Sequence, residues 1–351
     1  MQPMNEAPDN TAAGAAGAAS DRPLGELQVR CLIYDAAGNC RPLKALADIS
    51  EELREPTTFV WLDAVDPQPS DFAFIAEEFS LHPLAIEDAL KDHDRPKIEA
   101  YGESWFVIVQ GATRAGERLR IHELSLFVGA QFLVSVRTEP PYPLDEVERR
   151  WQFLPATLRR DSGALLYTLL DTVVDGYTPV AQAFEDRVEA LESALLGDAR
   201  RTNEVLLEIY AMKKELNRFR HAVVPVRDML TPIMRGDLPL LGADELPYYR
   251  DVYDHVTRVI DQMDSARELV NNARDTHISV ASHRQNEVAK QLTIVATVFL
   301  PLTFITGFFG QNFGWLVNHI ADGKTFAAWG IGSEIAAFLA LLGYFRFKRW
   351  F

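Results

Sequence analysis

A long uncharged segment near the C-terminal end constrains this chain more than any other feature. No Asp, Glu, Lys or Arg occurs from Gln291 to Ala321, although 24% of the 351 residues are charged. The apolar part of this segment, Leu292 to Phe309, is as long as a helix that crosses the hydrocarbon core of a bilayer. We therefore predict a first membrane-spanning helix at about residues 292–309.

A second apolar run covers residues 326–345 and ends in Arg346, Lys348 and Arg349. The two runs predict a transmembrane hairpin over residues 291–351. Basic residues collect on the cytoplasmic side of membranes, and the first 20 residues lack the basic start and apolar core of a signal peptide. We expect a multi-pass protein of the cell (inner) membrane with both termini in the cytoplasm. Two helices cannot enclose a pore, so a conduit requires an oligomer.

The composition narrows the classes of partner and function. A net charge of −15 argues against a nucleic-acid partner and is compatible with cation binding, although many soluble proteins are acidic. Cys31 and Cys40 lie in no disulfide or zinc pattern, as expected in a reducing cytoplasm. No phosphate-binding loop, HExxH motif or nucleophile–base set occurs, so we do not expect an enzyme.

The residues before the hairpin fall into three parts. Residues 1–24 read as a disordered tail, and residues 25–143 as an α/β domain with a mixed or antiparallel sheet. Residues 144–290 have helical periodicity, and no Pro or Gly occurs between Pro247 and Pro301. Residues 251–309 can therefore form one helix of roughly 85 to 90 Å. The predicted fold is an α+β cytoplasmic domain, a very long stalk helix and a two-helix transmembrane hairpin.

Several segments together resemble the CorA family of divalent metal-ion (magnesium/cobalt) transporters. They are WLDAVDP (61–67), FSLHPLAIEDAL (79–90), RPKIEAYGESWFVIV (95–109), PYYRDVYDH (247–255) and NEVAKQLTIVATVFLPLTFITGFFGQN (286–312). The sequence departs from the family at the signature after the first span. There the usual Gly-Met-Asn is Gly310-Gln311-Asn312, and the acidic loop that follows it in the family is absent.

The resemblance implies a homopentamer in the lipid bilayer with the first span lining the pore. It places Gly310, Gln311 and Asn312 at the outer mouth, where amide and carbonyl oxygens can hold hydrated Mg²⁺. The alternative for this turn is a helix C-cap with Gly310 in a left-handed conformation. Six further positions match the pore: Thr303, Leu300, Leu292, Ala289, Asn286 and Asp275. Without the resemblance, the two leucines would be read as lipid-facing or packing residues.

The resemblance also implies a cytoplasmic metal sensor. Asp88, Asp251, Glu87 and Asp171 match carboxylates that bind divalent ions across subunit interfaces in the family. Clustered carboxylates repel one another until a divalent ion bridges them, which would hold the pore closed. The alternative is that each carboxylate is a solvated helix residue.

Three functions remain open at this point. The first is a channel for Mg²⁺, which would be both transported and regulatory, with Co²⁺ and Ni²⁺ as further ions. The second is a zinc transporter of the ZntB type, with or without proton coupling. Zn²⁺ prefers His and Cys ligands, and the first span and the signature contain neither; His319 is the nearest candidate. The third is a membrane-anchored metal-binding protein without a conduit.

Overall fold

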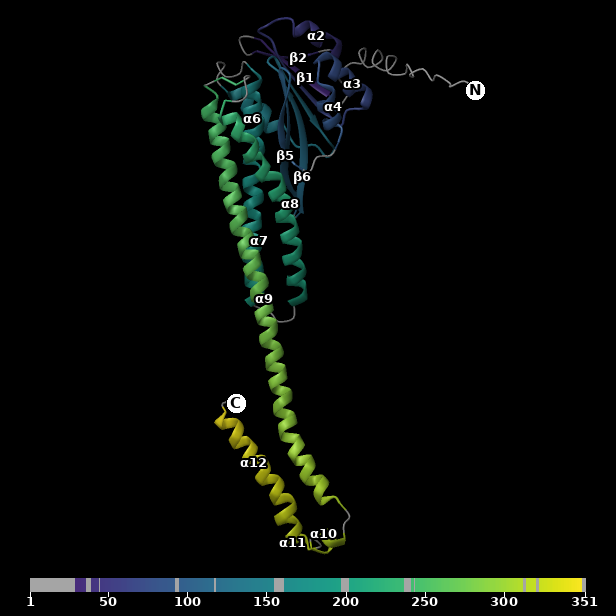
Figure 1. Ribbon diagram of the computed structural model, residues 1–351, viewed down its shortest axis with the longest axis vertical. Helices are drawn as coiled ribbons and strands as arrows, with labels where there is room; N and C mark the ends of the chain where they lie inside the picture. Colours follow the sequence, from purple (N-terminus) through teal and green to yellow (C-terminus); the bar gives the residue numbers. More distant parts are fainter. Residues whose placement is uncertain are drawn as a thin grey trace, which may run out of the picture. The chain divides into compact units, whose positions relative to one another are not determined.

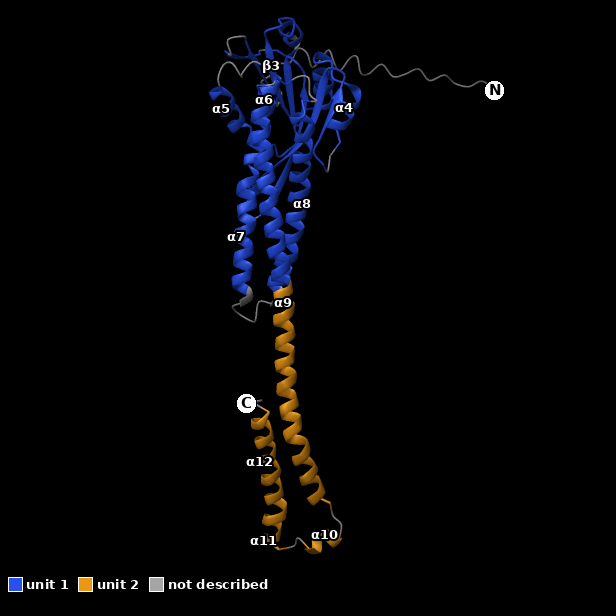
Figure 2. Cartoon of the chain, turned by 60° about the vertical axis from the view of Figure 1, so that its left-hand side comes forward, with its two compact units in different colours: residues 1–274 blue, residues 275–351 orange. Residues whose placement is uncertain are grey.

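The computed structural model describes most of the chain in two compact units, residues 1–274 and residues 275–351 (Figure 2). The described ranges are 29–35, 39–43, 45–91, 95–116, 118–154, 161–196, 202–236, 241–242, 244–311, 314–319 and 322–348. The predicted tail over residues 1–24 lies outside them. The predicted domain boundaries at residues 143 and 290 stay predictions.

A seven-stranded sheet forms the centre of the first unit (Figure 1). The strand order is β2-β1-β3-β7-β6-β5-β4, and β3 pairs with β7 in parallel whereas the other described pairs are antiparallel. The strands are β1 (Val29–Tyr34), β2 (Cys40–Pro42), β3 (Phe59–Val65), β4 (Lys97–Tyr101), β5 (Ser104–Ala115), β6 (Arg118–Val128) and β7 (Phe132–Arg137). The predicted mixed sheet is confirmed. Sequence reasoning missed β2 and β4, the two edge strands.

Helices cover both faces of the sheet (Figure 1). One core contains Val60 and Leu62 from β3 and packs against helices α3 and α4. The other contains Phe59 and Trp61 from the same strand and packs against helices α5 to α8 and against α9 (Leu246–Phe309). This alternation follows from the two-residue period of a strand. The helices of this unit are α2 (Ile49–Glu52), α3 (Pro69–Glu78), α4 (Pro83–Ala89), α5 (Asp145–Phe153), α6 (Ser162–Asp175), α7 (Tyr177–Leu196) and α8 (Thr202–Met234), with a short 3₁₀ helix, η2 (Leu46–Asp48).

The continuous helix predicted over residues 251–309 is confirmed, and it begins five residues earlier: helix α9 runs without interruption from Leu246 to Phe309. Up to Ala273 it buries apolar side chains at helical spacing in the core of the first unit, namely Tyr249, Val252, Val256, Val259, Ile260, Met263, Ala266, Val270 and Ala273. In the last part of α9 the apolar side chains are largely exposed. The first part of α9 is therefore a core helix, whereas its last part requires lipid or other copies of the chain around it.

The second unit contains the end of α9 and a second apolar helical segment, Gly323–Phe347. Both segments are long and apolar enough to span a membrane, and in the single chain almost none of the residues in their apolar parts is buried. The second consists of α11 (Gly323–Thr325), a π-helical segment η4 (Phe326–Ile331) and α12 (Gly332–Phe347), and α10 (Gly314–His319) lies in the connection. The two predicted candidate membrane-spanning helices are thus present.

A buried ion pair fixes the parallel junction between β3 and β7. The Asp63 and Arg137 side chains are 6% and 10% exposed. Arg137 Nε donates to Asp63 Oδ1 at 3.0 Å, its Nη2 donates to the other carboxylate oxygen, and its Nη1 donates to the Tyr142 carbonyl. Ser135 Oγ also donates to Asp63 Oδ1, at 2.7 Å. The network joins two strands more than 70 residues apart to the segment that leads into α5.

The beginning of α9 is fixed against the beginning of α6. Tyr249 Oη donates to the Gly163 carbonyl at 2.8 Å, and Glu245 is buried close to the same glycine. A Cβ atom at Gly163 would lie 2.5 Å from Glu245 Oε2, so any larger residue would force the Glu245 side chain to move. Burial, followed by a hydrogen bond with the Asp161 carboxyl, raises the pKa of Glu245 to about 8.

We predict that Arg137→Met destabilises the first unit by about 3–5 kcal/mol, because it leaves the Asp63 carboxylate buried without its counter-charge. The measurement is guanidinium unfolding of the full-length protein in detergent. Arg41→Met is the matched control, since Arg41 pairs with Glu52 at an exposed position and its loss should cost less than about 1 kcal/mol. Equal effects of the two substitutions would contradict this account.

We predict that Glu245 makes the protein less stable as the pH rises. Its raised pKa means that the folded protein retains a proton which the unfolded chain releases above about pH 4.5. The stabilisation is therefore complete below that pH and is lost as the pH approaches 8. Thermal unfolding of wild type between pH 5 and 8.5 should show this loss, and Glu245→Gln should flatten it. Glu268→Gln, at an exposed position of α9, should leave the profile unchanged.

Candidate functional site

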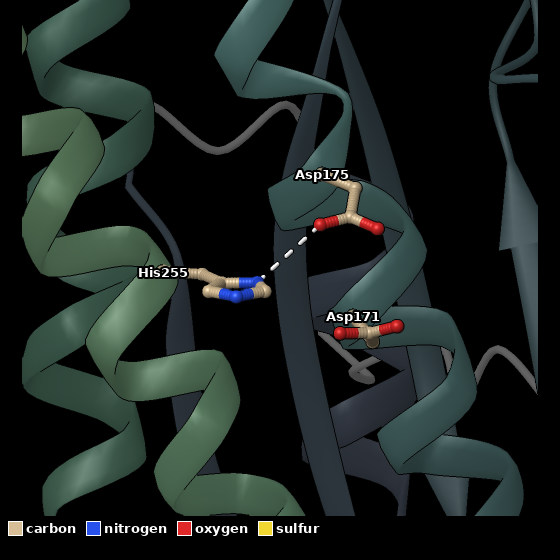
Figure 3. A group of neighbouring side chains, drawn as sticks. All are labelled: Asp171, Asp175 and His255. Atoms are coloured by element: carbon tan, nitrogen blue, oxygen red, sulfur yellow. Dashed lines mark ion pairs between the residues drawn. The ribbon is translucent and has the colours of Figure 1, made fainter.

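Two aspartates and a histidine from two helices form a compact group in the first unit (Figure 3). Asp171 and Asp175 lie on one face of α6, because residues four apart are one helical turn apart. His255 reaches them from α9, and one ligand atom from each residue lies within 4.8 Å of the others. Carboxylate oxygens together with an imidazole nitrogen are a donor set suited to divalent transition metals.

Arg150 on α5 already contacts both carboxylates of this group. Its Nη1 atom lies 2.7 Å from Asp171 Oδ2 and 2.7 Å from Asp175 Oδ2. On the other side, His255 Nδ1 lies 3.4 Å from Asp175 Oδ1, and His255 Nε2 lies 3.8 Å from Asp251 Oδ1. Of the predicted sensor residues, Asp171 belongs to this group, and Asp251 lies beside it through its approach to His255.

The Asp171 carboxylate is the most enclosed of these acids, with 14% of its side chain exposed. Burial is the first cause that raises the pKa of Asp171, and the charge of Asp175 is the second. Arg150 and His255 act in the opposite direction. The negative charge of Asp171 is therefore disfavoured by its surroundings even with Arg150 beside it.

The other two predicted sensor residues lie on α4, each beside a lysine of the same chain. Asp88 forms an ion pair with Lys97 on β4, and Lys97 Nζ also lies 2.9 Å from Glu99 Oε2. Glu87 pairs with Lys91 at 2.6 Å, one turn along. Neither acid belongs to the Asp171 group within the described part of one chain.

Sequence reasoning missed Asp175 and His255. Both lie four residues after a predicted sensor acid, Asp171 and Asp251 respectively, and therefore on the same helix face. His255 is also the last residue of the segment PYYRDVYDH. That spacing was the available signal, but only the folded chain shows that the two helix faces meet.

The predicted pore positions lie on the part of α9 that is exposed in one chain. At about 100° per residue they fall within roughly a third of the helix circumference, so they form one stripe. These residues are Asp275, Asn286, Ala289, Leu292, Leu300 and Thr303. The Thr303 hydroxyl donates to the Phe299 carbonyl at 2.7 Å, which leaves its oxygen lone pairs directed outward as acceptors.

The end of α9 is closed by backbone hydrogen bonds. Gly310 N donates to the Thr306 carbonyl at 2.9 Å, and Gln311 N donates to the Phe308 carbonyl at 3.3 Å. Gly310 is not among the described glycines with positive φ, so the alternative of a left-handed C-cap at Gly310 is wrong. Asn312 lies outside the described residues.

A mixed sheet with covering helices, an uninterrupted long helix and two exposed apolar helical segments define a membrane protein with a large soluble unit. The chain belongs to the CorA-like Mg²⁺ transporter family, whose model matches residues 56–349. It is therefore a CorA-type divalent-cation transporter.

Individual relatives agree with this assignment. The chain is 29% identical over 309 residues to the cobalt/magnesium transport protein CorA of Thermotoga maritima, a match that covers 85% of each chain. The CorA magnesium transporter of Methanocaldococcus jannaschii has the same fold, with a TM-score of 0.73 at 20% identity over 90% of this chain and 97% of that one. The ZntB cytoplasmic domain of Vibrio parahaemolyticus also shares the fold of the part it covers, with a TM-score of 0.57 at 13% identity over 74% of this chain and all of that one.

We predict that His255→Ala weakens Co²⁺ binding about tenfold and Mg²⁺ binding less than about twofold, because imidazole is a ligand for Co²⁺ whereas Mg²⁺ prefers oxygen. Calorimetric titration of the purified full-length protein measures both affinities. His221→Ala, at an exposed position of α8, is the control and should change neither affinity. Equal losses for the two metals would show that His255 is not a ligand.

Proposed function

We propose that this protein is a homopentameric channel that admits Mg²⁺ across the cell (inner) membrane, with Co²⁺ and Ni²⁺ as further substrates, and that cytoplasmic metal closes it. The observation that carries the proposal is the continuity of α9. One uninterrupted helix bears Asp251 and His255 near its beginning and the exposed stripe from Asp275 to Thr303 in its later part. We assign no catalytic activity.

The pore part of the proposal rests on the chemistry of the exposed stripe. Five copies of α9 that face one another with this stripe would form a lining with apolar rings from Ala289 to Leu300 and polar rings on either side of them. Leu292 and Leu300 would supply the apolar constriction, and Thr303 would supply oxygen atoms. Gly310-Gln311-Asn312 would act at the outer mouth as a variant of the family signature, gripping hydrated Mg²⁺ through its water shell.

The gating part rests on the cluster around Asp171. Mg²⁺ or Co²⁺ would bind to carboxylates of the Asp171 group, with Asp251, Asp88 and Glu87 as further acids that meet across subunits in the assembly. A bound ion would stabilise one arrangement of the subunits relative to others, so its loss would shift the population towards the conducting state. The feedback would match uptake to the cytoplasmic metal concentration.

We predict that replacing Asp171 and Asp251 together by Asn keeps the channel open at high internal Mg²⁺. Liposomes that contain the protein and a Mg²⁺-sensitive dye measure influx against internal Mg²⁺. The double variant should require about tenfold more internal Mg²⁺ for half-inhibition, a shift of about 1.4 kcal/mol in apparent affinity. Asp264→Asn is the control. Asp264 lies on α9 and pairs with Arg220 of α8, so this variant should behave as wild type. Unchanged inhibition in the double variant would contradict the sensor.

A zinc transporter is the second candidate, and His255 is the observation that favours it. Zn²⁺ binds imidazole nitrogen more readily than Mg²⁺ does. The same liposomes, loaded with a Zn²⁺ dye and placed in a pH gradient, separate the two functions. Zn²⁺ flux that follows the proton gradient, without Mg²⁺ flux, would overturn the magnesium proposal.

The third hypothesis is a membrane-anchored binding protein without a conduit. The mass of the assembly, which gives the number of subunits, tests this hypothesis. Mass measurement in detergent should give five subunits for a channel. A monomer or dimer with no flux of any divalent ion would favour the anchor.

A further inference from the structure

Three of the four acids matched to the metal sensor, Asp171, Asp88 and Glu87, already have an Arg or Lys partner within one chain. Arg150 contacts Asp171 and Asp175, Lys97 contacts Asp88, and Lys91 contacts Glu87. Repulsion between uncompensated carboxylates is therefore an incomplete description of the metal-free state.

We propose that Arg150 is a tethered competitor of the divalent ion at the Asp171–Asp175–His255 cluster, so that metal binding exchanges the guanidinium for the ion. This inference rests on the proposed sensor and names a residue that sets its affinity. The exchange is a change of ion-pair partners and involves no covalent step.

The geometry places the guanidinium and the metal in competition for the same ligands. Arg150 Nη1 lies 2.7 Å from an oxygen of each of the two aspartates. A divalent ion held by both aspartates and His255 would lie within a few ångströms of this positive charge. Partial burial keeps water from screening the repulsion, because about a third of the Arg150 side chain and less of Asp171 are exposed. The ion and the guanidinium therefore exclude one another.

A second contact gives Arg150 a position to which it can withdraw. Its Nε donates to Glu146 Oε1 at 2.8 Å, and Glu146 lies four residues earlier on the same helix, α5. When the guanidinium leaves the aspartates it keeps this carboxylate as a partner. The exchange thus leaves no buried charge without a counter-ion.

The neighbouring Arg149 provides a matched control. It also pairs with Glu146, through Nε at 2.8 Å and Nη2 at 2.6 Å, and the described contacts include none between Arg149 and the aspartates. Its side chain is 65% exposed. Removing Arg149 deletes one positive charge from the same helix turn without removing the proposed competitor.

The experiment is calorimetric titration of full-length protein in detergent with Co²⁺ and then with Mg²⁺. Arg150→Gln should bind Co²⁺ about tenfold more tightly than wild type, because the competing charge is gone. Arg149→Gln should stay within about twofold of wild type, because exposed charges are screened. A merely structural role for Arg150 predicts weaker binding, so the direction of the change separates the two. Equal or weaker binding by Arg150→Gln overturns the inference.

A third variant keeps the inference testable if Arg150→Gln does not fold. Glu146→Gln removes the position to which Arg150 withdraws, so it should weaken Co²⁺ binding, whereas tighter or unchanged binding would overturn the inference. The Asp171→Asn/Asp251→Asn double variant separates this inference from the sensor itself. If the double variant binds Co²⁺ as tightly as wild type does, the proposed sensor is wrong. If the double variant binds Co²⁺ weakly but Arg150→Gln does not bind it more tightly than wild type, the sensor stands and only the proposed exchange is wrong.

Discussion

The backbone hydrogen-bond ladder of α9 is the constraint on which the rest of the structure depends. In this helix of 64 residues, as in most helices of proteins, packing of an apolar face contributes more stability than helix propensity does. The buried stripe from Tyr249 to Ala273 provides that packing within the first unit. The contact of Tyr249 with Gly163 and the burial of Glu245 fix where the helix begins.

Sequence reasoning succeeded where one local signal decided the structure. The absence of Pro and Gly between Pro247 and Pro301 was sufficient to predict the continuous helix, and the lack of charge after Gln291 was sufficient to predict the first candidate span. It failed for β2 and β4, because all three residues of β2 are exposed and β4 is only partly buried. Edge strands like these lack the apolar alternation by which strands are recognised.

Only some residues of the candidate site could be predicted from the sequence. Asp171 and Asp251 were found through the resemblance, whereas Asp175 and His255 required knowledge that α6 and α9 face one another. Arg150 required a third helix, α5, and its contact with Asp171 joins positions 21 residues apart. Ion pairs between helices depend on packing geometry, and no periodicity in one segment predicts them. The sequence therefore predicts carboxylates that repel one another, whereas in the structure Arg150 balances the charges of Asp171 and Asp175.

The pairing of β3 with β7 has a consequence for the order in which the chain is made. All seven strands lie before residue 138, whereas the first candidate span begins roughly 150 residues later. At about 5–20 residues per second, the ribosome therefore adds the first apolar segment roughly 8 to 30 seconds after the last strand. The sheet can form around Asp63 and Arg137, in water, before any segment that requires lipid has emerged. The order of synthesis thus separates in time the folding of the sheet in water from the insertion of the apolar helices into lipid.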